Sequence, residues 1–228
     1  MRAVLDRVIA AVGAVASAPV VAVVAFLVRR QDGGPGLIKV DRVGRHGTVF
    51  GMWKIRSMRI MSDDGLAGGV TLTTVQDDRI TPVGRWIRAL HLDELPQLYN
   101  VLAGDMALLG PRPEAPDWVE DGPAWREVLT VRPGIAGPTQ LIVAEWERES
   151  IGAADDGSAY VSEVLPVKLA IDAWYVRSAS PGLDLLVVSS LVERVALRRR
   201  ARRLEREIAD RVGPASLPIA WLDAHFSR

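Results

Sequence analysis

Residues 8–28 form the feature that most constrains this chain, an uninterrupted apolar run without a charge, VIAAVGAVASAPVVAVVAFLV. As one helix the run would be about 32 Å long, enough to cross a hydrocarbon core of roughly 30 Å. A cleaved secretory signal is the competing interpretation, because the small-x-small sequence at 16–18 resembles a cleavage site. However, the run continues for ten more residues and a proline follows at once. We therefore expect a membrane anchor that stays in the protein.

The flanks and the middle of the run bear on how this anchor sits in the membrane. Arginines lie on both sides of the run: Arg2 and Arg7 before it, Arg29 and Arg30 after it. The positive-inside rule therefore assigns no orientation across the membrane, because both ends favour the cytoplasmic face. Pro19 removes a backbone donor near the centre and predicts a kink or break. Ser17 is close enough to bond a carbonyl that the break frees. These residues suit a re-entrant helix that enters and leaves on one side, but by themselves they leave a spanning helix equally open.

The composition excludes several classes of function. Basic and acidic residues balance at 28 each, so no global field favours nucleic acid or another polyanion. The absence of cysteine excludes disulfides, thiolate metal sites and cysteine nucleophiles. The three histidines are widely spaced, which argues against a histidine-built zinc site: His46, His91 and His225. A length of 228 residues suits one domain with peripheral segments.

The rest of the chain predicts an α+β fold that is mainly helical. Residues 37–59 alternate in short stretches broken by two glycines and read as a hairpin, and the polar, Gly-rich residues 61–79 read as a loop. Thr81 and Pro82 make a good helix start. A second helix is expected from Asp93 to about Leu102, ended by Gly104. Further helices are expected at 118–128, 162–177 and 183–211.

The last of these helices is strongly basic. Its arginines are Arg194, Arg198, Arg199, Arg200, Arg202, Arg203 and Arg206. They form either a solvated face, partly paired with Glu193, Glu205 and Glu207, or a surface that lies on anionic lipid headgroups. In a protein already anchored in a membrane, the second use is favoured. Nucleic-acid binding is disfavoured because no aromatic stacking platform accompanies the arginines.

Two adjacent carboxylates, Asp93 and Glu94, stand in the apolar stretch HLDELPQL. One interpretation is a helix start, in which Asp93 caps the helix and Glu94 complements the dipole of its first turn. A cap needs only one carboxylate, however, and a second one adds repulsion unless cations are near. The alternative is an active site, in which one carboxylate holds a hard metal ion and the other acts as a nucleophile on phosphorus.

Cations suited to phosphate binding occur on both sides of this pair. Arg85 and Arg88 belong to the preceding helix, Arg112 lies in the loop GPRPE, and Lys54 and Arg56 belong to the predicted hairpin. The spacing alone does not show that these side chains meet in space.

The order of these residues resembles a known family. Residues 77–114, DDRITPVGRWIRALHLDELPQLYNVLAGDMALLGPRPE, are similar to the signature block of the bacterial sugar transferases, the monotopic phosphoglycosyl transferases, with Ala107 where serine is usual. The stretches GPGLIKVDRVGRHGTVFGMWKIRSMR, VRPGIAG and IDAWYVRSASPGLDLLVV also resemble segments of that family. The resemblance covers about residues 1–190. Its central block is long and specific.

The resemblance implies an activity and roles for individual residues. Asp93 would attack the β-phosphorus of a nucleotide sugar, usually UDP-linked, and expel UMP. Polyprenyl (undecaprenyl) phosphate would then displace Asp93 and give a polyprenyl-diphosphate sugar, the first membrane step of glycan or exopolysaccharide assembly. Glu94, with Asp93, would hold Mg²⁺. The phosphates would be bound by Arg112, with Arg88, Lys54 and Arg56 as further candidates.

The resemblance also implies an architecture and a location. Residues 1–30 would be a re-entrant anchor broken near Ser17 and Pro19, residues 31–190 a compact interfacial catalytic domain, and residues 191–228 a basic helix and tail. The protein would be monotopic in the bacterial inner membrane, with its domain on the cytoplasmic face and in contact with membrane lipids. No nucleic-acid partner is expected, and a homodimer is left open.

Three departures from the family's pattern limit what is implied. Val40 stands where glutamine is common, and GPTQLIVAEWERES at 137–150 replaces a Gly-Arg loop near the nucleotide and sugar, so the sugar is not identified. The extra N-terminal domains of larger relatives are lacking, which suggests a minimal member. Two other functions stay open: a catalytically silent membrane scaffold of polysaccharide assembly, and a phosphatase acting on lipid phosphates.

Overall fold

The computed structural model describes residues 2–59, 78–144, 146–147, 160–195 and 201–212. They form two compact units, the first of Met1–Leu108 with Pro113–Val119 and the second of Leu109–Arg112 with Glu120–Arg228. The N-terminal helix belongs to the first of these units, and the functional division expected at 1–30, 31–190 and 191–228 stays a prediction. The predicted α+β, mainly helical class is confirmed: helices dominate, and the described strands form two small sheets.

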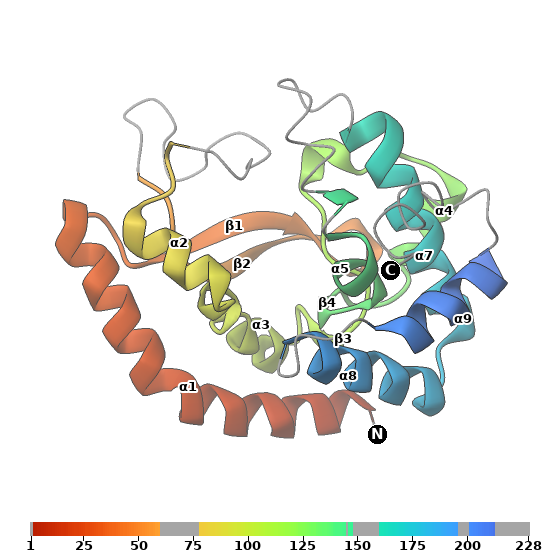
Figure 1. The fold of residues 1–228 in the computed structure, drawn as a ribbon, viewed down its shortest axis with the longest axis horizontal. Coiled ribbons are helices and arrows are strands. Elements are labelled where there is room, and N and C mark those ends of the chain that lie inside the picture. The colour runs from red at the N-terminus through yellow and green to blue at the C-terminus, as the bar shows by residue number, and fades with distance from the viewer. Residues whose placement is uncertain (1, 60–77, 145, 148–159, 196–200, 213–228) are drawn as a thin grey trace. The chain divides into compact units, whose positions relative to one another are not determined.

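The apolar run lies in a single long helix, α1 (Arg2–Asp32), which has Pro19 inside it and bends along its length (Figure 1). By length and composition alone, α1 could cross a membrane. The Ser17 hydroxyl donates to the Ala14 carbonyl at 3.4 Å. The carbonyl that Pro19 deprives of its helical donor is that of Val15. Ser17 therefore bonds the carbonyl one residue before the one that the proline frees.

α1 buries one stripe of small side chains and exposes the rest. The buried residues are four, seven, three and four positions apart, which places them on one helix face: Ala10, Ala14, Val21, Val24 and Val28. The other faces expose a large apolar surface made of Val4, Leu5, Val8, Ile9, Val12, Val15, Val20, Val23, Phe26 and Leu27. An aqueous surface helix would carry polar residues there, so this surface suits a lipid environment.

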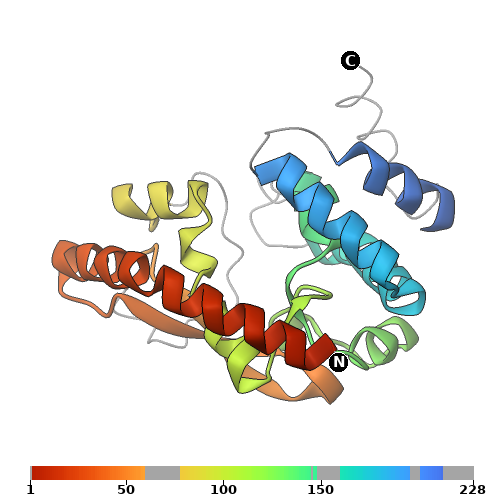
Figure 2. The same ribbon diagram turned by 90° about the horizontal axis from the view of Figure 1, so that it is seen from below.

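Both halves of α1 contact the first unit (Figure 2). In the N-terminal half, a Cβ at Gly13 would lie 3.2 Å from Cδ1 of Leu98 on α3 (Gln97–Ala103). In the C-terminal half, a Cβ at Gly36 would lie 2.2 Å from the Ala25 carbonyl oxygen, so only glycine lets the chain turn back along the helix. The anchor is therefore packed against the domain over most of its length.

The predicted hairpin is confirmed. β1 (Leu37–Val43) and β2 (Val49–Ile55) pair antiparallel, with Leu37 opposite Ile55, and the short η1 (Arg45–Gly47) lies in the turn. The predicted helix start is also confirmed: α2 (Pro82–Ala89) is capped by the Thr81 hydroxyl, which accepts from the Gly84 N–H at 2.9 Å. The loop expected at 61–79 lies mostly outside the described residues.

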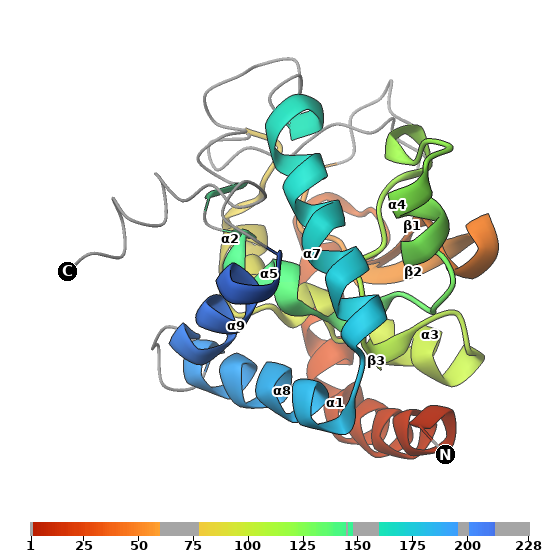
Figure 3. The ribbon, with the colours of Figure 1, turned by 90° about the vertical axis from the view of Figure 1, so that its right-hand side faces the viewer.

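The second unit is built around α7 (Leu165–Ser178), which α4 (Pro123–Val128), α5 (Pro138–Ile142) and α9 (Arg202–Val212) contact (Figure 3). A π-helical turn, Tyr160–Val164, leads into α7, and α8 (Pro181–Val195) packs on α5 and α9. Before α5 in the chain, the end of β3 (Ala107–Leu109) pairs with β4 (Gly134–Ala136). The helices expected at 118–128 and 162–177 are thus present with shifted ends; η3 (Pro116–Trp118) belongs to the first unit.

The single basic helix predicted at 183–211 is wrong, because the described residues there form two helices, α8 and α9, with Ala201 outside both. Ala201, Leu204 and Ile208 are fully buried in the second unit. α9 therefore uses its apolar side against the protein and leaves its arginine-rich side outward. Lipid contact by α9 would rest on charge alone. Arg198, Arg199 and Arg200 lie outside the described residues, as does the tail at 213–228.

An ion pair between a buried arginine and a more exposed aspartate fixes the end of α1 to the hairpin. Arg56, whose side chain is 4% exposed, donates to both carboxylate oxygens of Asp32 at 2.5 and 2.6 Å, and also to the carbonyls of Pro35 and Met58 at 2.7 and 3.0 Å. These hydrogen bonds hold the pKa of the Asp32 carboxyl below its ordinary value of 3.8, with the Gly34 N–H helping. Every nitrogen of the Arg56 guanidinium thus has a partner within the connector.

Asp32→Asn is expected to lower the melting temperature in detergent by about 5 °C, because it leaves a buried guanidinium without its counter-charge. Since the folded-state pKa of Asp32 is lowered, the charged carboxylate stabilises the fold fully above pH 4, and this contribution is lost as the pH falls through the folded-state value. Thermal melts of both proteins between pH 7 and pH 3 should therefore converge at the acid end.

The matched control is Asp121→Asn, which removes a 2.9 Å ion pair to Arg126 whose two side chains are 82% and 71% exposed. That change should shift the melting temperature by no more than about 1 °C. Equal effects of the two substitutions would show that burial of the Asp32 pair is not what stabilises the connector.

Candidate functional site

The two predicted carboxylates lie on a short turn between two helices. η2 (Leu92–Glu94) carries Asp93 and Glu94, and it follows His91, whose φ of 54° is left-handed. That conformation costs a non-glycine residue about 1 kcal/mol, and it reverses the chain sharply between α2 and the turn. The predicted capping role of Asp93 is wrong: His91 precedes η2, Pro96 precedes α3, and neither start has a side-chain cap. Asp93 lies inside the turn, partly exposed.

The leucines on either side of the carboxylates anchor this turn. Leu92 and Leu95 are partly buried and pack against an apolar cluster of Val21, Val24, Val28, Ile55 and Ile87. The three valines of this cluster belong to α1. The sequence Leu-Asp-Glu-Leu therefore places two apolar side chains against a core cluster to which α1, β2 and α2 all contribute. The helix η2, which carries both carboxylates, packs on β2 and α2.

Two of the predicted phosphate-binding cations belong to elements that pack against this turn. Arg88 is partly buried in the last turn of α2, and its carbonyl accepts from the His91 N–H at 3.2 Å. Lys54 is on β2, opposite Ile38, and β2 packs on η2. Both residues therefore belong to the same unit as Asp93 and Glu94. Arg56 directly follows the end of β2, but its guanidinium is engaged by Asp32, Pro35 and Met58, so phosphate binding would require it to leave them.

Arg112 belongs to the second unit, in a loop that a contact between two glycines shapes. The Gly110 N–H donates to the Ala136 carbonyl at 3.0 Å, and the Gly134 N–H donates to the Pro111 carbonyl at 2.8 Å. A Cβ at Gly134 would lie 2.1 Å from the Gly110 nitrogen, so no other residue fits there. The segments LGPRP and RPGIA, which looked like separate motifs in the sequence, thus form one structure that presents Arg112.

Asn100 is the residue that the sequence reasoning missed. It is 2% exposed on α3, and its side chain accepts from the Trp53 N–H at 2.9 Å and donates to the Gly51 carbonyl at 3.0 Å and to Asp105 at 3.2 Å. These bonds attach the helix that follows the carboxylate turn to the hairpin strand that carries Lys54. A polar residue at a buried position of an amphipathic helix is the signal that could have identified it.

The chemistry of the donor set allows a divalent cation with few protein ligands. Within the described residues, no group of three or more histidines, aspartates and glutamates is gathered to hold a metal ion. Mg²⁺ usually binds through one or two carboxylates and completes its shell with waters and substrate phosphates. The adjacent Asp93 and Glu94 are compatible with that mode and not with a closed, all-protein site.

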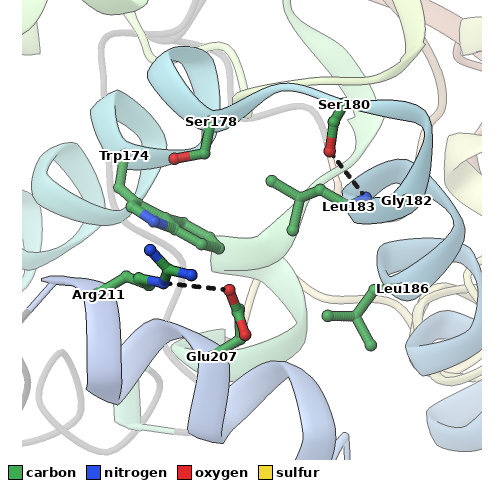
Figure 4. A pocket seen from close by; sticks show the side chains of 8 residues that line it. All are labelled: Trp174, Ser178, Ser180, Gly182, Leu183, Leu186, Glu207 and Arg211. Atoms are coloured by element: carbon green, nitrogen blue, oxygen red, sulfur yellow. Dashed lines mark hydrogen bonds and ion pairs between the residues drawn. The ribbon is translucent and has the colours of Figure 1, made fainter.

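A pocket of about 390 Å³ lies in the second unit among α7, α8 and α9 (Figure 4). The Trp174 indole and an ion pair of 3.5 Å between Arg211 and Glu207 line it, together with Ser178 and Leu183. None of the residues predicted for the site is among those that line it.

Comparison with known proteins places these features in a family. The profile of the family described as bacterial sugar transferase matches residues 1–198. The chain is 35% identical over 193 residues to an undecaprenyl-phosphate glucose phosphotransferase of Komagataeibacter xylinus, which covers 82% of this chain and 34% of that protein. It is 34% identical over 191 residues to a UDP-glucose:undecaprenyl-phosphate glucose-1-phosphate transferase of Caulobacter vibrioides, covering 81% of this chain and 66% of the relative.

A third relative acts on another sugar according to its name. It is the undecaprenyl-phosphate galactose phosphotransferase of Salmonella typhimurium, 34% identical over 184 residues, covering 74% of this chain and 35% of that protein. The chain thus spans about a third of the length of the Komagataeibacter and Salmonella relatives. Similarity of this degree extends to proteins named for different sugars.

Asn100→Ala is expected to lower the melting temperature by about 5–10 °C, because the Trp53 N–H and the Gly51 carbonyl lose their partner and each unpaired group costs roughly 1–3 kcal/mol. The neighbouring Tyr99 is 42% exposed, so Tyr99→Ala is the matched control and should change the melting temperature little. Thermal melts in the same detergent compare the two. Similar melting temperatures for both variants would contradict the attachment role of Asn100.

Proposed function

This chain belongs to the bacterial sugar transferase family, and we propose that it transfers a sugar 1-phosphate from a nucleotide sugar to polyprenyl phosphate. The observation that carries the proposal is that Leu92 and Leu95, on either side of Asp93 and Glu94, pack against a core cluster in which the anchor helix supplies Val21, Val24 and Val28. An acceptor with a membrane-embedded chain and a charged phosphate head must react at the membrane interface. A carboxylate pair fixed to an apolar helix with a large exposed apolar surface meets that requirement.

The proposed reaction has two displacements at one phosphorus. In the first, a carboxylate oxygen of Asp93 forms a bond to the β-phosphorus of a UDP-sugar, and the bond from that phosphorus to the bridging oxygen breaks, so that UMP leaves with the oxygen. In the second, a phosphate oxygen of the polyprenyl phosphate bonds to the same phosphorus. The bond to Asp93 breaks and the carboxylate is restored, leaving a polyprenyl-diphosphate sugar.

Both displacements bring an anion to an anionic phosphorus, so positive charge is needed. Arg88 and Lys54 lie on elements that contact the carboxylate turn. Arg112 is the third candidate, and for this residue the proposal rests on the family resemblance of the loop GPRPE. Glu94, with Asp93, would hold Mg²⁺, which supplies charge screening to the phosphates when bound.

We further propose that α1 is re-entrant. A straight spanning helix would carry half of its length away from the domain on the far side of the membrane. In α1 the buried stripe extends from Ala10 to Val28, and both halves contact the first unit. Its exposed apolar faces would then lie in one leaflet, with the domain on the cytoplasmic face of the inner membrane.

Asp93→Asn should abolish UMP release, because an amide oxygen is too weak a nucleophile for the first displacement, while its similar shape should leave the melting temperature within a few degrees. The assay uses purified protein in nanodiscs with undecaprenyl phosphate, Mg²⁺ and a panel of UDP-sugars, and measures UMP. The panel is needed because the relatives are named for glucose and galactose.

The same assay separates the two other functions. A lipid-phosphate phosphatase would release free phosphate from the lipid without any nucleotide sugar, and a silent scaffold would release neither product. UMP release that persists in Asp93→Asn would remove Asp93 from the role of nucleophile. No UMP from any nucleotide sugar with the unaltered chain would overturn the proposed function.

The topology can be tested with single cysteines, since the chain has none of its own. Ala3→Cys and Arg30→Cys label the two exposed ends of α1, and Gly122→Cys marks the domain at a position where a Cβ meets nothing within 4 Å. A membrane-impermeant maleimide should label all three in inside-out vesicles and none in right-side-out vesicles. Labelling of the Ala3→Cys protein from the opposite side would restore a spanning helix.

A further inference from the structure

Gln97 is a buried residue whose polar atoms the fold does not use. It is 0% exposed, and neither Nε2 nor Oε1 of its carboxamide has a hydrogen-bond partner among the described residues. An unpaired buried polar atom costs roughly 1–3 kcal/mol. A methionine would fill a similar volume without that cost, so packing alone does not account for a glutamine here.

Gln97 follows Asp93 by four residues and is the first residue of α3. Leu95 has φ −53° and ψ −39° and Pro96 has φ −64° and ψ −14°, so the chain stays right-handed between η2 and α3. The Glu94 and Leu95 N–H groups donate to the His91 and Leu92 carbonyls, three residues back, so this turn is wound more tightly than an α-helix. Because side chains on a helix lean toward its N-terminus, the carboxamide of Gln97 is directed back toward the turn that carries Asp93.

A second buried amide on the same helix shows the contrast. Asn100 follows three residues after Gln97, and its side chain is bonded to Trp53, Gly51 and Asp105. Where this helix uses a buried amide for structure, the hydrogen bonds are made. Gln97, which is nearer to the carboxylate turn, makes none.

We propose that Gln97 is a positioning residue for Asp93, an inference that rests on the proposed function. Its Nε2–H donates to one carboxylate oxygen of Asp93 when the nucleotide sugar is bound, so that the other oxygen faces the phosphorus. The cations at the turn are then taken by the phosphates of the donor. A neutral donor from the protein side orients the carboxylate and leaves the negative charge that makes it a nucleophile. An arginine or lysine in its place would neutralise that charge.

The test compares the full chain with Gln97→Met in nanodiscs, using the UDP-sugar that the unaltered protein accepts, undecaprenyl phosphate and Mg²⁺. Loss of orientation should lower kcat about 10- to 100-fold with KM for the UDP-sugar changed less than about twofold. The melting temperature should be unchanged or higher, because an unpaired amide is removed. Gln97→Leu, a second apolar replacement, should behave alike.

A second measurement assigns the defect to a step. Without undecaprenyl phosphate, the rate of the single UMP burst reports the attack of Asp93 alone, and it should fall by the same factor as kcat in Gln97→Met. An unchanged kcat, an unchanged burst rate, a rise in KM alone, or a fall in activity that follows a fall in melting temperature would each overturn the inference. Any of these results still requires UMP release by the unaltered protein, so failure of the proposed function would be recognised separately.

Discussion

The packing of Leu92 and Leu95 against the cluster formed by α1, β2 and α2 is the interaction on which the rest of the site depends. It joins the carboxylate turn to the same core as the helix that carries the exposed apolar surface. Any reaction at Asp93 therefore occurs at a depth set by the position of α1. For an enzyme whose acceptor cannot leave the membrane, this arrangement removes the need for a flexible arm to bring the nucleophile to the headgroups.

Two further contacts hold the elements around that turn. Arg56 ties the end of α1 to the end of the hairpin through Asp32, and Asn100 ties α3 to β2. The helix that follows the turn and the helix that contributes to its core are thus both fastened to the hairpin. Rigid support of this kind matters for an anionic nucleophile, since an error of about 1 Å in the attacking position can cost a factor of roughly 100 in rate.

The sequence predicted the elements whose signals are local. The hairpin, the Thr81 cap and the end of the second helix follow from residues within a few positions: Gly104 indeed ends α3 with a φ of 94°. The role of Arg56 could not be predicted in this way, because its partner Asp32 is 24 residues away and a buried arginine looks the same in sequence as a phosphate ligand. The sequence left a capping role of Asp93 open because the left-handed conformation of His91, which begins the turn, cannot be recognised from its neighbours.

The division of the basic segment into α8 and α9 was missed for a related reason. Its arginines suggested one continuous helix, whereas the apolar residues that settle the matter, Leu204 and Ile208, are buried by distant parts of the second unit. Long-range burial also explains the pairing of the two glycine motifs around Arg112, which no spacing rule connects.

One face of α1 belongs to the core of the first unit and the others are apolar and exposed, so in the proposed function the same helix would serve both anchoring and catalysis. Burial of a valine contributes roughly 1.5–3 kcal/mol, so the burial of Val21, Val24 and Val28 in this cluster is worth a large fraction of the stability of a domain. A tether that only localised the enzyme could be exchanged for any other membrane helix. α1 could not be exchanged in this way, because its inner face is part of the core against which Leu92 and Leu95 pack, while its outer face carries the exposed apolar surface.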